Sequence, residues 1–186
     1  MPIDLSPDTL LLKNQGEIGC MPLKIFTPYR IVDHVNEITP EFLKSKGITT
    51  VLMDLDNTLT RWNADDIDDE VFYWIKNLKS EGVRPCIVSN NKRSRIEKIA
   101  KMLEVPFIYR AAKPRKGSYR RALEAMNSPA TKTAFVGDQL FTDVFGANRM
   151  QLYSILVKPI HPHEFIGTKI MRMFEKIVMP FIKPRE

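Results

Sequence analysis

Short apolar runs alternate with amphipathic helical patterns between residues 48 and 160. Five of these runs have the length and the β-branched content of buried strands. They cover residues 48–54, 85–89, 106–109, 133–137 and 153–157. Because strands that alternate with helices favour a parallel sheet covered by helices on its faces, the pattern predicts an α/β fold.

The segments between these runs carry apolar residues at helical spacing. In the first one, Asp66 is a candidate N-cap and Gly82 a candidate C-terminal residue. Its apolar positions are Ile67, Val71, Ile75 and Leu78, and similar patterns follow at Ile96, Ile99 and Leu103 and at Tyr119, Ala122, Leu123 and Met126. Before the first strand, Thr39-Pro40-Glu41 predicts a helix start and Gly47 its end.

Length and composition indicate one globular domain. The chain has 186 residues, of which 44% are hydrophobic and 27% charged, and these are ordinary values for a folded protein. No apolar run approaches the roughly 20 residues that cross a bilayer, and Asp4 and Asp8 stand where a secretion signal would be positively charged. We therefore expect an intracellular protein. Cys20 and Cys86 lack metal-ligand spacing, and the apolar run around Cys86 predicts a buried thiol outside any disulfide.

The net charge of +6 favours anionic partners. Phosphorylated metabolites, nucleic acid and an acidic membrane face all satisfy this condition, so charge alone does not choose among them.

Polar residues follow four of the five strands, at the rim where an open parallel sheet gathers its reactive groups. These are Asp54-Leu55-Asp56-Asn57-Thr58, Ser89-Asn90-Asn91, Lys113-Pro114 and Gly137-Asp138-Gln139-Leu140-Phe141-Thr142-Asp143. Phosphoryl transfer needs a nucleophile, a proton donor, a cation on the phosphoryl oxygens and further hydrogen-bonding or positive groups. The four segments supply each of these, and the sequence predicts a phosphoryl-transfer site.

Each role has a candidate. Asp54 is the expected nucleophile, and Asp56, two residues later, is the expected general acid and base. A divalent cation must offset the repulsion between a carboxylate and a phosphate, and oxygen ligands favour Mg²⁺ over zinc. Ser89 and Lys113 are also predicted to be catalytic. The predicted metal residues are Asp54, Asp56 and Asp138, the predicted phosphate-binding residues are Thr58, Ser89, Asn90 and Lys113, and Asp143 is expected to orient waters or Lys113.

The four segments resemble the four motifs of the haloacid dehalogenase superfamily over residues 48–160. In detail, Asp54-Leu55-Asp56-Asn57-Thr58-Leu59, Val88-Ser89-Asn90-Asn91, the segment 105–111, Lys113-Pro114 and the segment 136–143 resemble the YqeG-type branch of subclass IIIA. The resemblance implies a three-layer Rossmann-like fold with strand order 3-2-1-4-5 and an aspartyl-phosphate intermediate. Members of this branch in mitochondria and plastids are phosphatidylglycerophosphate phosphatases. Residues 21–47 also resemble the start of that branch, and residues 1–20 look like an extension beyond it.

The spacing of the motifs excludes an inserted cap domain. The intervals from Asp56 to Ser89 and from Ser89 to Lys113 accommodate only a flap, helices and one strand. An open site admits a phosphate on a large carrier such as a lipid, a protein or a nucleic-acid end, although an oligomeric partner can also act as a cap. Basic residues are expected around the mouth, either as a plain solvated surface or for binding an anionic membrane or polyphosphate. They are Lys92, Arg93, Arg95, Arg115, Lys116, Arg120 and Arg121.

Residues 161–186 are predicted to form an amphipathic helical segment that packs either on the domain or on a membrane. Its apolar stripe is Ile166, Ile170, Met173, Phe174 and Ile177, with Lys169, Arg172 and Lys176 elsewhere. His161 and His163 flank Pro162 in a bend without acidic neighbours, which is typical of a loop and not of a metal site. Trp62 follows the first motif closely enough to line the site entrance.

These observations lead to one main hypothesis and two alternatives. The main hypothesis is a Mg²⁺-dependent phosphomonoester hydrolase that converts phosphatidylglycerophosphate to phosphatidylglycerol in the cytoplasm, at the inner face of the cell membrane. One alternative is a soluble phosphatase for a small metabolite, a nucleotide or a nucleic-acid end. The other is a binding or assembly factor without turnover, which the intact motifs disfavour. No specific nucleic-acid partner is predicted, and the oligomeric state is left open.

Overall fold

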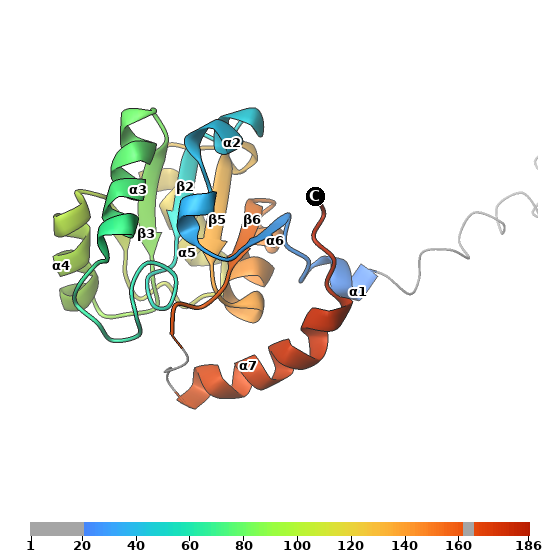
Figure 1. The fold of residues 1–186 in the computed structure, drawn as a ribbon. Helices are drawn as coiled ribbons and strands as arrows, with labels where there is room; N and C mark the ends of the chain where they lie inside the picture. The colour runs from blue at the N-terminus through green and yellow to red at the C-terminus, as the bar shows by residue number, and fades with distance from the viewer. Residues whose placement is uncertain (1–20, 162–165) are drawn as a thin grey trace, which may run out of the picture.

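A parallel sheet forms the centre of the molecule (Figure 1). A computed structural model describes residues 21–161 and 166–186, with side chains for 23–161 and 170–186. Within the described residues the sheet has six strands, ordered β1-β6-β5-β2-β3-β4, and every neighbouring pair is parallel. The strands are β1 (Arg30–Val32), β2 (Thr50–Met53), β3 (Arg84–Val88), β4 (Phe107–Ile108), β5 (Thr133–Gly137) and β6 (Tyr153–Val157).

The five strands predicted from the sequence are β2 to β6, and their spatial order is the predicted one. The sixth, β1, was not predicted. It has three residues and pairs through Arg30 with Ile155 at the edge of the sheet. A strand this short gives no alternation long enough to detect, because its formation depends on the edge that β6 offers.

The helical segments connect the strands and flank the sheet. The α-helices are α1 (Met21–Lys24), α2 (Pro40–Ser45), α3 (Asp69–Ser80), α4 (Arg93–Leu103), α5 (Lys116–Ala125), α6 (Phe145–Arg149) and α7 (Ile166–Val178). Single helical turns are η2 (Val35–Glu37), η3 (Ala130–Lys132), η4 (Leu140–Val144) and η5 (Met179–Phe181).

A local sequence signal explains where α2 begins, but the signal predicted for the start of α3 does not hold. The Thr39 side chain accepts the Phe42 N–H at 3.2 Å, which caps α2 as predicted. Helix α3 begins at Asp69, so the prediction that Asp66 caps it is wrong. Asp66 instead accepts the Thr60 hydroxyl at its backbone oxygen and binds Arg61 with its carboxylate. Asp66 therefore belongs to the loop after β2.

Two hydrophobic clusters fill the layers on either side of the sheet. One joins α2, α3 and α4 to it and includes Leu43, Ile75 and Ile96. The other joins α5 and α6 to the opposite face through Tyr119 and Ala147. This is the predicted three-layer α/β architecture. Cys86, on β3, is a fully buried free thiol as predicted, whereas Cys20 lies outside the described residues.

Helix α7 runs past the carboxyl ends of the strands (Figure 1). A third cluster attaches its C-terminal end: Val178 and Ile182 pack with Leu140 and Val144 of η4 and with Leu156 of β6. Among the described residues, no helix combines the length and the apolar composition that crossing a bilayer requires. The predicted boundaries at residues 21 and 160 stay predictions, and residues 1–20 lie outside the described part of the chain.

Candidate active site

A buried ionic chain lies where β2, β5 and the loop after β4 meet. Lys113 Nζ stands 2.6 Å from Asp54 Oδ1 and 2.7 Å from Asp143 Oδ1, and all three side chains are almost fully buried. Asp54 follows β2 and its N–H donates to the Val136 carbonyl on β5. Sequence-distant residues are thus held together by the sheet itself.

Two local features hold Lys113 and Asp143 in place. The backbone N–H of Lys113 donates to Asn90 Oδ1 at 2.8 Å, which ties the loop after β4 to the loop after β3. Gly137 ends β5, and a Cβ at this position would overlap the Asp143 carboxylate. The glycine of the fourth motif therefore makes room for the partner of Lys113.

Burial and neighbouring charges shift the protonation of this chain. Burial raises the pKa of Asp54 to about 7, although Lys113 opposes the shift. Burial acts to lower the pKa of Lys113, but the Asp143 and Asp54 carboxylates outweigh it and keep that pKa above its ordinary value. Lys113 is therefore a fixed positive charge beside the expected nucleophile.

Three buried carboxylates form a group that suits a divalent cation. Asp54, Asp138 and Asp143 each offer an oxygen, and these oxygens lie within 4.8 Å of one another. Burial raises the pKa of Asp138 well above its usual value, with Arg172 opposing the shift, and Thr58 Oγ1 donates to Asp138 Oδ1 at 3.2 Å. Clustered, desolvated carboxylates repel one another, and a hard divalent cation with oxygen preference relieves that repulsion. The donor set fits such a cation.

Asp56 lies apart from that group. Its Oδ1 is 2.7 Å from Arg95 Nη2, and its Oδ2 accepts a hydrogen bond from the Asn91 side chain. The Asp56 carboxylate faces the pocket with Asp54. The predicted roles of Asp56, as general acid and base and in metal binding, stay predictions.

A pocket of about 470 Å³ is lined by Asp54, Asp56 and Lys113. Ser89 is buried and accepts the Asn91 N–H at 3.3 Å, and Ser89 and Asn90 both line the pocket. Trp62, 41% exposed, lines it as the sequence led us to expect. Thr58 is buried against Asp138 and does not line the pocket. Its predicted role in phosphate binding stays a prediction.

Sequence reasoning missed two residues of α7 at this site. Arg172 contacts both the carboxylate and the backbone carbonyl of Asp138, and it pairs with Glu175 at 2.9 Å. Glu175 Oε1 accepts the Leu140 N–H at 2.6 Å and the Phe141 N–H at 3.3 Å. One signal was available: Glu175 is the single acidic residue between 166 and 185, three positions after an arginine.

The basic residues expected around the mouth divide into two groups. Arg95 lines the pocket, whereas Lys92, Arg93, Arg115, Lys116, Arg120 and Arg121 are exposed and outside its lining. His161 is partly buried, and His163 lies outside the described residues, so the histidine pair is not described as a unit.

Comparison with known proteins agrees with this geometry. The model of the haloacid dehalogenase-like hydrolases matches residues 41–151. The chain is also 34% identical over 160 residues to "Probable phosphatase YqeG" of Bacillus subtilis (strain 168), covering 86% of this chain and 93% of that protein. The chain belongs to the haloacid dehalogenase-like hydrolase family. The carboxylates that follow β2 and β5 belong to the sequence motifs that resembled this family.

Solved structures show the same fold. The cobalt-bound deoxy-D-mannose-octulosonate 8-phosphate phosphatase of Haemophilus influenzae has a TM-score of 0.52 at 15% identity, with 74% of this chain and 90% of that chain covered. An uncharacterized protein of Listeria monocytogenes serotype 4b has a TM-score of 0.51 at 15% identity, with 72% and 99% covered. At this identity the likeness establishes the haloacid dehalogenase-like fold and leaves the substrate open.

The buried ionic chain leads to a stability prediction. Lys113→Met should lower the free energy of unfolding by about 3–5 kcal/mol at neutral pH without divalent cation, because two buried carboxylates lose their counter-charge. The loss should shrink as the pH falls below 7, since Asp54 then takes up a proton and less unpaired charge remains buried. Urea unfolding across this pH range measures both effects.

Lys116→Met is the matched control, because Lys116 is an exposed lysine three residues along the chain. It should change stability by less than about 0.5 kcal/mol at any pH. Equal losses in the two variants would contradict the assigned role of Lys113.

Proposed function

We propose that this protein hydrolyses phosphatidylglycerophosphate to phosphatidylglycerol and inorganic phosphate, with Mg²⁺ as its cofactor. The chain is a phosphatase of the haloacid dehalogenase-like family. The observation that carries the proposal is that Asp54 and Lys113 line an open pocket, with the buried carboxylates of Asp138 and Asp143 grouped beside Asp54. The assignment of a lipid substrate rests in addition on the resemblance of the motifs in this chain to those of the phosphatidylglycerophosphate phosphatase branch.

The proposed reaction uses the side chains that line the pocket. Asp54 attacks phosphorus, the bond from phosphorus to the ester oxygen breaks, and Asp56 gives its proton to the leaving glycerol oxygen. Asp56 then takes a proton from the water that attacks the aspartyl phosphate, which frees phosphate and restores the Asp54 carboxylate. Lys113 holds positive charge beside Asp54 throughout, and Ser89 and Asn90 bind phosphoryl oxygens at the pocket wall.

Mg²⁺ would be held by the carboxylates of Asp54 and Asp138, which lie in one group of carboxylate oxygens. Asp56, predicted from the sequence as a metal residue, would supply a further oxygen donor. When bound, it neutralises phosphoryl oxygens so that a carboxylate can approach them.

Access to the pocket supports a large substrate. Between Asp56 and Ser89 the chain forms a loop, α3 and β3, and no domain is inserted there to close over the pocket. The pocket lining combines charged groups with Trp62 and Met171. A phosphate at the end of a lipid headgroup can enter such a pocket while its acyl chains stay in the bilayer. On this basis we also propose a peripheral location at the cytoplasmic face of the cell membrane.

A substrate comparison tests the proposal. With Mg²⁺, the purified protein should release phosphate from phosphatidylglycerophosphate in mixed micelles at least about 100-fold faster, as kcat/KM, than from soluble monoesters, a difference of roughly 3 kcal/mol in transition-state binding. The panel should include nucleotides, sugar phosphates and 5′-phosphorylated oligonucleotides. A short-chain soluble phosphatidylglycerophosphate is the control, because it presents the same headgroup without a micelle surface.

Faster turnover of a soluble nucleotide or sugar phosphate would favour the alternative of a small-metabolite phosphatase. Preference for a phosphorylated oligonucleotide would favour a nucleic-acid end. Either result would overturn the lipid assignment and leave the catalytic roles unchanged.

A further inference from the structure

The outer face of α7 is apolar and exposed. Ile170, Met173, Phe174 and Ile177 recur at helical spacing and are 52%, 68%, 55% and 66% exposed, and Phe181 in η5 is 70% exposed. Five of the twelve large apolar or aromatic side chains that are exposed among the described residues thus lie between positions 170 and 181. The sequence left two alternatives for this stripe, packing on the domain or on a membrane, and in the structure these side chains do not pack on the domain. The side chain of Ile166 lies outside the described part.

Polar contacts on the inner face of the same helix explain this orientation. Arg172 binds Asp138, and Glu175, which is 5% exposed, binds the backbone N–H groups of Leu140 and Phe141. Turning the apolar stripe inward would remove Arg172 and Glu175 from these buried partners, and leaving buried polar groups unpaired costs several kcal/mol. The contacts therefore fix α7 with its apolar face outward.

We propose that this outward face of α7 docks on a lipid bilayer that carries anionic headgroups. An amphipathic helix binds in the interface when its apolar side chains enter the acyl boundary and flanking cations meet the lipid phosphates. Lys176 is exposed on α7 and Lys183 is exposed after η5, and the single acidic side chain of residues 170–185, Glu175, is buried inward. The face therefore presents apolar groups and positive charge together, and this pair of properties fits an anionic membrane.

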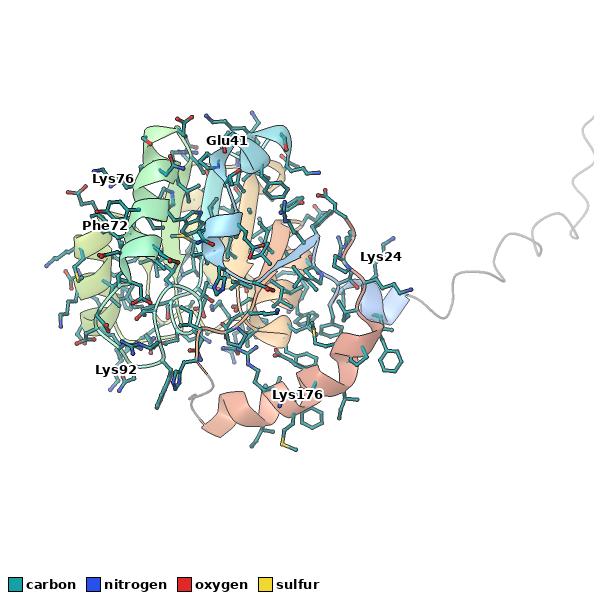
Figure 2. All side chains as sticks on the ribbon, in the orientation of Figure 1. Lys24, Glu41, Phe72, Lys76, Lys92 and Lys176 are labelled. Carbon is teal, nitrogen blue, oxygen red and sulfur yellow. The ribbon has the colours of Figure 1, made fainter. Side chains whose placement is uncertain are left out.

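The position of α7 connects docking with catalysis. Met171 of α7 lines the pocket together with Asp54, Asp56 and the half-exposed Trp62. Figures 1 and 2 show α7, with Lys176 on it, across the end of the sheet where the pocket residues lie, and Lys92 at that same end. A bilayer against α7 would lie beside the pocket mouth. This part rests on the proposed lipid substrate, whereas docking itself is testable without it.

Vesicle binding by the full chain tests the proposal. The probe is a set of vesicles of phosphatidylcholine alone, or of phosphatidylcholine and phosphatidylglycerol in equal amounts, with binding measured by co-sedimentation. Wild-type protein should bind the anionic vesicles at least about tenfold more tightly. The triple variant Met173→Ser, Phe174→Ser and Ile177→Ser should bind them on the order of 100-fold more weakly, because three side chains no longer enter the interface.

Phe72→Ser, Tyr73→Ser and Met102→Ser form the matched control. These side chains are 41%, 63% and 46% exposed and lie on α3 and α4, away from α7, as the Phe72 label in Figure 2 shows. The control should bind vesicles like wild type. Both triple variants should hydrolyse soluble p-nitrophenyl phosphate at the wild-type rate and keep the wild-type melting temperature.

A third arm tests the charge contribution. Lys176→Glu should weaken binding to anionic vesicles by about tenfold and leave the weak binding to phosphatidylcholine alone unchanged.

Several results would overturn the proposal. These are an absence of vesicle binding by wild type, equal binding by the α7 variant, or a wild-type dimer in sedimentation that the α7 variant makes monomeric, which would assign the face to a second copy of the chain. Vesicle binding without hydrolysis of phosphatidylglycerophosphate would keep the docking surface and reject the substrate. Hydrolysis in micelles without vesicle binding would do the reverse.

Discussion

Replacing Asp54 by Asn should reduce phosphate release by about 10⁴-fold or more, since the amide cannot form an acyl phosphate. The fold should persist. Burial of the Asp54 carboxylate raises its pKa to about 7, because burial disfavours the charged form. The neutral side chain of Asn has a similar shape and therefore removes a desolvated charge. Lys113 keeps Asp143 as a partner at 2.7 Å. Steady-state phosphate release and thermal unfolding of the same preparation measure the two expectations.

The nucleophile can also be identified directly. Wild-type enzyme quenched in acid during turnover of a ³²P-labelled substrate should carry label on Asp54, and Asp54→Asn should carry none. Asp33→Asn is the control, because Asp33 is an exposed carboxylate whose partner is Lys158. Turnover retained by Asp54→Asn would remove Asp54 from the mechanism, whatever the stability data show.

Removing divalent cations should lower turnover by on the order of 10³-fold, corresponding to about 4 kcal/mol of lost charge neutralisation in the transition state. Mg²⁺ should restore the rate. It should also raise the melting temperature, because it relieves the repulsion among Asp54, Asp138 and Asp143. Chelation followed by titration with Mg²⁺, read by rate and by thermal unfolding, measures both.

Asp138→Asn localises that effect. The variant should need at least about tenfold more Mg²⁺ for half-maximal rate, since one buried carboxylate ligand is lost. Thr58 and Arg172, which contact this carboxylate, can still contact an amide oxygen. An unchanged Mg²⁺ requirement in Asp138→Asn would place the cation elsewhere.

The fold was predictable where periodic patterns were long. Strands β2, β3, β5 and β6 are continuous apolar runs because both faces of the sheet are covered by helices, and buried parallel strands have this appearance. Strand β1 was not predictable in this way. Its three residues depend on an edge that only the folded sheet provides.

The core of the site was predictable for a related reason. Asp54, Ser89, Lys113 and Asp138 follow consecutive strands, and parallel topology brings such positions to one rim. The partners of Asp56 and Asp138 were not predictable, because Asn91, Arg95 and Arg172 reach them through loop and helix positions that the strand pattern does not specify. The orientation of α7 was left open because amphipathicity identifies an apolar face but not what covers it.

Arg172 lies on α7 and contacts Asp138, so it connects this helix with the carboxylate group of the site. A change in this contact therefore changes both the free energy with which α7 is held in its position and the free energy of the group formed by Asp54, Asp138 and Asp143. Such linkage is reciprocal. If a cation bound at Asp138 strengthened the adsorption of α7 to a membrane surface by a given factor, the cation would bind more tightly to the adsorbed protein by the same factor. With α7 docked on a membrane as proposed, Arg172 would couple that docking to cation binding at Asp138.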